Sequence, residues 1–278
     1  MTEFLKVEGG QLAYDVTGEG PLVLLAHGMG DGRRAFRFLA PELVAAGFRV
    51  ATTDLRGHGE SSAEWPSHTR TDVAGDLLAL VRHLGGPAVL VGHSFAGGAA
   101  TIAAAQAPEL VSAVVELGPF TRAQRLDAGG LLRDARHRKG VMLLLGAAIL
   151  RSVGLWKKYF DHAMPGVKPA DHAEYVAALE ADLRRPGRMA AVARMGQAAP
   201  TDAGARLPDL TRDVLVVMGT LDPDWADPRA EAEGIVAAMP AGRGRIAMIE
   251  GAGHYPHAQF PAQVAAAVTS FVKERVHA

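Results

Sequence analysis

The stretch Val91-Gly92-His93-Ser94-Phe95-Ala96-Gly97-Gly98 decides the fold of this 278-residue chain. An apolar run at 88–91 precedes the serine, as in a buried strand, and an alanine-rich run at 99–107 follows with helical composition. The stretch is close to the Gly-x-Ser-x-Gly signature, with Ala96 at its last position. A serine on such a sharp strand-to-helix turn has a strained backbone, and small residues beside it leave room for the helix. We therefore predict that the turn exposes the Ser94 hydroxyl above a sheet as a nucleophile.

A serine hydroxyl is a strong nucleophile only when a base accepts its proton and an acid orients that base. The candidate acid is Asp222, three residues after an apolar run that ends at Gly219. The candidate base is His254, just after the last run of strand type. Serine, aspartate and histidine follow one another here in an order known for catalytic triads. Alternatives in comparable loops are Asp224 and Asp227 for the acid, and His257 and His58 for the base.

Acyl transfer also needs N–H donors that hold the negative charge of the intermediate. The backbone N–H of Phe95, at the start of the predicted helix, is one candidate. The N–H of Met29, in the loop after an earlier strand, is the other. A competing interpretation of that loop is dinucleotide binding, because Gly28-x-Gly30 follows a strand. The third glycine of that motif would stand at position 33, which is arginine, so the oxyanion site is favoured.

Strand-type and helix-type runs alternate along the chain, which indicates a mostly parallel sheet with helices on both faces. Between Phe120 and Leu207 the pattern is helical throughout and no strand is predicted. Because this block lies between two strands of the sheet, we predict an inserted helical cap. The predicted strands are 4–8, 11–16, 21–26, 48–53, 88–91, 110–117, 213–219 and 245–250, and the predicted helices outside the cap are 34–46, 71–84, 99–107, 228–239 and 261–276.

The composition excludes several classes of function. Apolar residues make up 49% and charged residues 21% of the chain, as in ordinary soluble globular proteins. The formal net charge of −1 gives no electrostatic basis for binding nucleic acid or an anionic membrane. The chain has no cysteine, which excludes thiolate catalysis, and its 11 histidines form no clustered metal-ligand pattern. We expect no cofactor and no metal. Because the first residues lack a signal-peptide pattern, we expect a cytoplasmic location.

Five motifs stand at predicted strand ends: His27-Gly28, Asp54-x-Arg56-Gly57-His58-Gly59-x-Ser61, Gly92-His93-Ser94-Phe95-Ala96-Gly97, Gly219-x-x-Asp222 and Gly253-His254. Together they resemble the α/β-hydrolase fold superfamily, in particular its capped serine hydrolases. The resemblance covers nearly the whole chain. It implies a mostly parallel eight-stranded sheet, with a core of residues 1–120 and 208–278 and a helical cap of residues 121–207. It also implies a catalytic triad, two oxyanion amides, and a scaffold role for Arg56 and His58.

The predicted function is hydrolysis of a carboxylic ester or lactone with an apolar portion, through an acyl-Ser94 intermediate and without a cofactor. The partner is a small-molecule substrate. The same resemblance leaves alternatives open: a C–C bond hydrolase or a cofactor-free perhydrolase with the same triad, or a ligand receptor without turnover. Activity should rise with pH as His254 becomes neutral, near its ordinary pKa of about 6.5.

The candidate pocket residues are aromatic or apolar side chains beside the triad or in the cap. Trp225 follows the acid and Tyr255 follows the base. The full set is Trp156, Trp225, Tyr255, Leu144 and Phe120. Arg122, Arg125 and Arg133, near the start of the cap, are candidates for contact with an anionic substrate, although arginines on helices usually face solvent.

Overall fold

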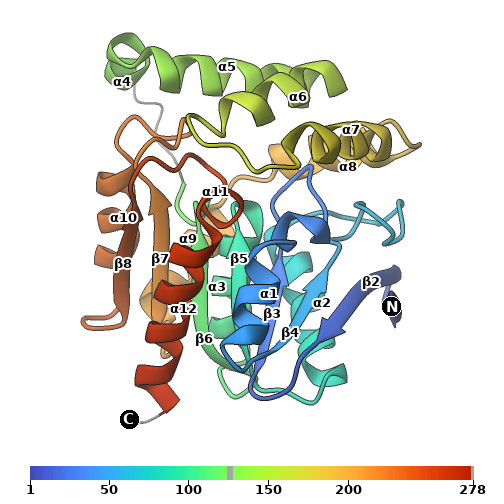
Figure 1. Ribbon diagram of the computed structural model, residues 1–278, viewed down its shortest axis with the longest axis vertical. Helices are drawn as coiled ribbons and strands as arrows, with labels where there is room; N and C mark the ends of the chain where they lie inside the picture. The colour runs from blue at the N-terminus through green and yellow to red at the C-terminus, as the bar shows by residue number, and fades with distance from the viewer. Residues whose placement is uncertain (124–127, 277–278) are drawn as a thin grey trace.

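The computed structural model describes residues 1–123 and 128–276. Its strands are β1 (Glu3–Val7), β2 (Gly10–Thr17), β3 (Leu22–Ala26), β4 (Arg49–Thr53), β5 (Ala88–His93), β6 (Val111–Leu117), β7 (Val214–Gly219) and β8 (Gly244–Ile249). They form one sheet in the order β1-β2-β4-β3-β5-β6-β7-β8 (Figure 1). β1 pairs with β2, and β2 with β4, in antiparallel fashion, and the remaining pairs are parallel. The predicted mostly parallel, eight-stranded sheet is confirmed.

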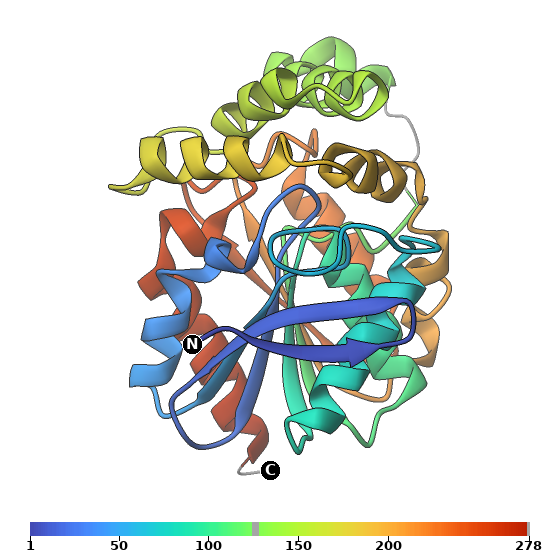
Figure 2. The ribbon, with the colours of Figure 1, turned by 90° about the vertical axis from the view of Figure 1, so that its right-hand side faces the viewer.

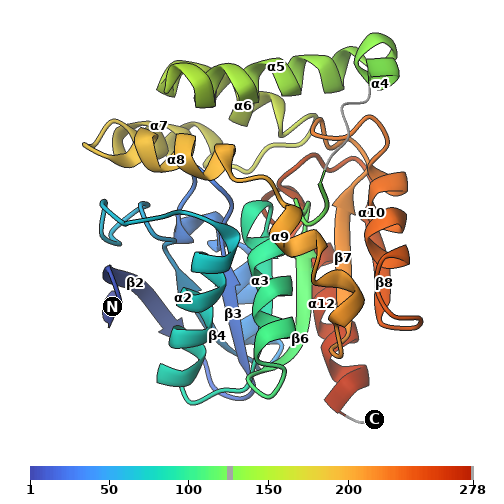
Figure 3. The same cartoon turned by 180° about the vertical axis from the view of Figure 1, so that it is seen from behind.

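Helices cover both faces of this sheet (Figures 1 and 3). One face carries α1 (Leu39–Ala45) and α12 (Pro261–Val276), which pack against each other. The opposite face carries α2 (Arg70–His83), α3 (Phe95–Gln106) and α10 (Pro228–Ala237). An apolar core fills the space on each side of the sheet. The sheet is therefore the middle layer of three, as in doubly covered α/β proteins.

The sequences of the central strands account for this layering. All residues of β3, β5 and β7 are buried, and these strands read as continuous apolar runs, because helices cover them on both sides. The helix α2 begins with a capping box in which Thr69 and Asp72 satisfy each other's backbone N–H groups. The helix α10 begins at Pro228, with the Asp227 side chain accepting from the N–H of Ala230.

One predicted helix, at 34–46, is wrong as a single element. The structure has a short 3-10 turn at Arg33–Phe36, and then α1 starts only at Leu39. Pro41 explains the break, because it has no N–H to donate to the carbonyl of Arg37. An α-helix that began before Leu39 would therefore lack one of its regular hydrogen bonds.

A helical insert lies over the carboxyl ends of the parallel strands (Figure 2). It consists of α4 (Ala128–Arg133), α5 (Ala135–Leu150), α6 (Val153–His162), α7 (His172–Leu183) and α8 (Arg188–Gln197). No strand occurs among the described residues of this insert. An aromatic cluster that includes Trp156, Tyr159 and Phe160 packs it onto Tyr255 of the core. The short α9 (Thr201–Gly204) then returns the chain to α2 and α3.

The turn between β5 and α3 has the strained conformation that its sequence predicts. Ser94 has φ of 53° and ψ of −116°, a region that a non-glycine residue occupies at a cost of about 1–3 kcal/mol. Gly92 lies against the backbone of the first helical turn, so a Cβ on it would fall 2.6 Å from the nitrogen of Gly97. Glycine at 92 is therefore required by the close approach of strand and helix.

Gly92→Ala should destabilise the protein, because the neighbouring atoms belong to backbone and cannot move aside. We expect a loss of about 1–3 kcal/mol in the free energy of unfolding, as for other overpacked positions. Urea unfolding measures this directly. Gly75→Ala is the matched control, since an added Cβ meets nothing within 4 Å in the middle of α2. That substitution should stabilise the helix by about 0.5–1 kcal/mol, and equal effects at both positions would contradict the packing argument.

Candidate active site

The strand order brings the candidate catalytic residues to one edge of the sheet. Ser94 follows β5, and its N–H continues the ladder by donating to the carbonyl of Leu117 at 2.9 Å. Asp222 follows β7 and His254 follows β8. Because these strands are parallel, their carboxyl ends meet beneath the insert, where open α/β sheets place their ligand sites.

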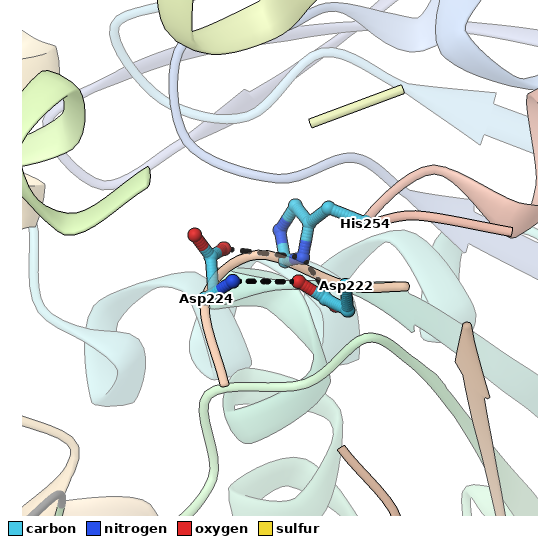
Figure 4. Close-up of side chains that lie close together, drawn as sticks. All are labelled: Asp222, Asp224 and His254. Carbon is cyan, nitrogen blue, oxygen red and sulfur yellow. Dashed lines mark hydrogen bonds and ion pairs between the residues drawn. The ribbon is translucent and has the colours of Figure 1, made fainter. Parts of the chain in front are cut away.

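His254 contacts two carboxylates through the same ring nitrogen (Figure 4). Its Nδ1 lies 2.9 Å from Oδ2 of Asp222 and 3.2 Å from Oδ2 of Asp224. The N–H of Asp224 donates to Oδ1 of Asp222 at 3.0 Å, which fixes the two acids relative to each other. A nitrogen facing two carboxylates carries the proton, so Nε2 is left as the basic nitrogen of the ring.

These contacts change the protonation behaviour of the histidine. Burial lowers the pKa of His254, but the charges of Asp222 and Asp224 and the hydrogen bond to Asp222 outweigh it and raise the pKa to about 9. Burial also raises the pKa of Asp224, to about 6, while His254 opposes that rise. The expectation of an ordinary histidine pKa is therefore wrong, because Asp222 and a second carboxylate, Asp224, together outweigh the effect of burial.

The alternative acids and bases have other surroundings. Asp227 caps α10, as described above. His257 is fully buried against the rings of Phe36 and His93, and burial lowers its pKa to about 3. His58 is buried in the turn after β4, where Nε2 accepts from the N–H of Gly30 at 3.0 Å. Of the alternatives, Asp224 alone joins the Asp222–His254 pair.

The candidate base His254 is also bonded to the helical insert. The N–H of His254 donates to the carbonyl of Ala163 at 2.8 Å. Tyr159 of α6 donates from its hydroxyl to Oδ2 of Asp224 at 2.6 Å. Burial raises the pKa of Tyr159 well above its usual value, so the phenol stays protonated as a donor. On the core side, Nε2 of His93 donates to the carbonyl of His254 at 2.9 Å. The position of the base thus depends on both the core and the insert.

The two candidate oxyanion amides flank the nucleophile. Phe95 is the first residue of α3, and Met29 follows β3. Within the described residues, neither N–H donates a hydrogen bond to another protein group. Both residues line the same cavity as Ser94 and His254. Free N–H groups at a helix start are suited to binding negative charge.

The cavity between the sheet edge and the insert has a volume of about 350 Å³. Four of the five predicted pocket residues line it: Trp156, Tyr255, Leu144 and Phe120. Trp225 is not among the lining residues. It lies in the apolar core next to α10, with its ring 5.2 Å from that of Phe120. The loop directs both carboxylates toward His254, whereas the indole that follows Asp224 packs into the core.

The arginines singled out in the sequence lie elsewhere. Arg122 forms a 2.6 Å ion pair with Glu231, and Arg133 is exposed on α4. Arg125 lies outside the described residues. None of these described arginines lines the cavity, but Arg70 does. The sequence did not indicate Arg70 as a lining residue or the bond from Tyr159 to Asp224, because both depend on tertiary packing rather than on a local pattern.

Asp222, Asp224 and His254 also place three possible metal ligands within 4.8 Å of one another. Hydrogen bonding already explains this arrangement. Both carboxylates contact Nδ1 of His254, and Asp222 also accepts from the N–H of Asp224. None of the helices in the described part of the chain combines the length and apolar character of a membrane span.

Comparison with known proteins identifies the class. Residues 23–267 match the sequence profile of the Alpha/beta hydrolase family, and the chain belongs to that family. It is 28% identical to 2-(acetamidomethylene)succinate hydrolase of Mesorhizobium japonicum, over 96% of this chain and 94% of that protein. The fold is similar to a thermophilic esterase from Thermogutta terrifontis, with a TM-score of 0.76 and 25% identity over 98% of this chain and 99% of the other. A bromoperoxidase from Bacillus anthracis has the same fold, with a TM-score of 0.79 and 21% identity over 98% and 100% of the two chains.

The effect of Asp224 on His254 can be tested by the pH dependence of kcat/KM for any substrate that the protein hydrolyses. A histidine base acts when neutral, so activity should rise with pH through the raised pKa of His254, above the ordinary value of about 6.5. Asp224→Asn removes one negative charge and should move the inflection down by roughly 1–3 pH units.

Asp227→Asn is the matched control, because Asp227 lies in the same loop and contacts α10 instead of the histidine. It should leave the inflection where it is. An unchanged inflection in Asp224→Asn would show that the second carboxylate does not act on His254.

Proposed function

We propose that this protein is a serine hydrolase that cleaves a carboxylic ester or lactone through an acyl-Ser94 intermediate. The proposal rests on one observation: a strained serine and a buried Asp222–His254 pair line the same cavity. Ser94 supplies the nucleophile and His254 the base, with Asp222 as the residue that orients the base. The insert at about residues 121–207 acts as the cap of this cavity.

The reaction has two halves. In the first, the Ser94 oxygen attacks the carbonyl carbon while Nε2 of His254 accepts the hydroxyl proton. The backbone N–H groups of Met29 and Phe95 bind the oxyanion, and the protonated histidine then donates to the departing alcohol. In the second, water attacks the acyl carbon as His254 accepts its proton. The acid leaves, and Ser94 recovers its hydrogen.

The structure joins Ser94 and His254 by a shared cavity rather than by a direct hydrogen bond between these two described side chains. Such bonds are often long without substrate and tighten in the Michaelis complex. The deeply buried Asp222–His254 pair already has its orientation, because its partners on the core and the cap hold it. Substrate binding then needs to align only the serine hydroxyl.

The cavity favours a substrate of modest size with apolar parts. Its lining includes Met29, Leu144, Trp156 and Met195 beside the catalytic residues. Methionine side chains adapt to different shapes, so the cavity suits a range of acyl chains. A volume of about 350 Å³ lies at the lower end for small-molecule sites. We therefore expect short to medium acyl groups to be preferred.

A series of p-nitrophenyl esters, from acetyl to decanoyl, tests the proposal. Wild-type protein should hydrolyse them with an optimum between butanoyl and octanoyl. Ser94→Ala removes the nucleophile and should lower kcat by at least about 10³-fold, while near-UV circular dichroism shows an unchanged fold. Substantial turnover by Ser94→Ala would overturn the assignment. Complete inactivity of the wild type toward every ester would shift the function to another bond type or to ligand binding.

A further inference from the structure

Arg70 is a buried cation in the wall of the catalytic cavity. It is the first residue of α2 and is only 4% exposed. It lines the cavity together with Ser94 and His254, amid side chains that are mostly apolar. Its guanidinium carbon lies 4.2 Å from the ring centre of Phe95, the residue that follows the nucleophile.

The contacts of Arg70 use only part of its hydrogen-bonding capacity. Nε donates to the carbonyl of Phe120 at 3.1 Å, and Nη1 donates to the carbonyl of Ala198 at 2.7 Å. A guanidinium has five N–H donors, and these two bonds leave Nη2 without a protein partner among the described residues. Both acceptors are neutral carbonyls, so neither balances the positive charge.

Arg70 also has no carboxylate within ion-pair distance among the described residues. Asp202 attracts it only at longer range, and the hydrogen bonds of that carboxylate come from Thr71 and from the N–H of Ala203. Arg56, another buried arginine, instead forms a 2.7 Å ion pair with Asp76. A buried charge without a partner is costly, and here the charge borders a cavity that can admit an anion.

Arg70 stays positively charged at neutral pH. Burial lowers its pKa to about 10, and the charge of Asp202 opposes that shift. Arg188 provides a useful contrast, since it is equally buried and also bonds carbonyls, those of Gly59 and Ser61. Arg188 does not line the cavity, so its role is confined to the loop that it holds.

A chain of two hydrogen bonds links this cation to the backbone of Ser94. Phe120 accepts from Arg70 through its carbonyl, and its N–H donates to the carbonyl of Ser94 at 3.2 Å. One residue thus links the guanidinium to the backbone of the nucleophile. Because Arg70 and Ser94 line one cavity of about 350 Å³, a small substrate with a short chain between its reacting carbonyl and an anionic end can contact both groups.

We propose that Arg70 binds a free carboxylate of the substrate, so that the preferred substrates are half-esters or related acids with a short chain between the carboxylate and the scissile carbonyl. This proposal deepens the ester hydrolase function and rests on it for the turnover measurements. Guanidinium and carboxylate match in geometry and form paired hydrogen bonds. The carboxylate would supply the opposite charge that Arg70 lacks.

The test compares two methyl esters of the same length, monomethyl glutarate and methyl pentanoate, by proton release in a pH-stat. The first carries a carboxylate where the second has a methyl group. Wild-type protein should favour the anionic ester in kcat/KM by at least tenfold. Arg70→Met should lower this ratio at least tenfold, and Arg70→Lys should lower it less, because it keeps the charge but loses the paired geometry.

Arg122→Gln is the control, because Arg122 is ion-paired to Glu231 outside the cavity. The ratio should be the same as in the wild type. A wild-type ratio near one, or an unchanged ratio in Arg70→Met, would overturn the proposal. Loss of the ratio in Arg122→Gln as well would show a general charge effect and would also overturn it.

A binding measurement separates this proposal from the ester function. Ser94→Ala protein is titrated with glutarate and with its neutral analogue glutaramide, and the melting temperature is recorded. Glutarate alone should raise it, and Arg70→Met in the same background should abolish the effect. If no ester is hydrolysed but glutarate still binds through Arg70, the carboxylate site stands and the ester function fails. If esters are hydrolysed but glutarate has no effect, the carboxylate site fails.

Arg70 also bonds the two ends of the insert, at Phe120 and Ala198, so its substitution can affect folding. Thermal unfolding of each variant identifies this case. If Arg70→Met does not fold, the proposal is tested by two measurements on other proteins. These are the preference of the wild type for the anionic ester in kcat/KM and the binding of glutarate to Ser94→Ala. Absence of both effects in those folded proteins would overturn the proposal.

Discussion

The ring of His254 is held by two carboxylates that reach the same nitrogen, and the rest of the site depends on that contact. Asp222 and Asp224 come from one loop after β7, while the histidine comes from the loop after β8. Their attraction ties these two strand ends together and turns the opposite ring nitrogen toward the cavity. It also raises the pKa of the base, which makes His254 a stronger proton acceptor but one that is neutral only at higher pH.

The helical insert covers the site and also contacts the residues that hold His254. Tyr159 bonds the second carboxylate, and the carbonyl of Ala163 bonds the N–H of the histidine. Nearby, the side chain of Gln259 donates to the carbonyls of Pro165 and Val167. Movement of the insert would therefore disturb the base directly. The charged groups are buried beneath the insert, where electrostatic interactions are stronger than in water.

Much of the fold could be predicted because its signals are local. Buried parallel strands read as continuous apolar runs, and Ser94 and Asp222 stand shortly after such runs. His254 follows β8, an edge strand that is mostly half-buried. The helix predicted at 34–46 failed through a single residue, Pro41. Trp225 was placed in the pocket from its neighbour in sequence, but the loop turns it into the core.

Other features of the site depend on contacts between distant segments. Tyr159 and Arg70 lie on helices whose sequences show only ordinary amphipathic patterns, and neither is near the triad in the chain. Asp222 raises the pKa of His254, and Asp224 raises it further as a second partner, which sequence spacing cannot distinguish from a turn residue. Such groups become visible only when strand order and helix packing are known.

Covalent labelling tests the central claim, that Ser94 is a nucleophile activated by His254, most directly. The protein is treated with a fluorophosphonate, which reacts with activated serines, and the modified peptide is identified by mass spectrometry. A single adduct on Ser94, with a much slower reaction in His254→Ala, is the predicted result. An adduct on a different residue, or equal labelling rates in the two proteins, would contradict the account.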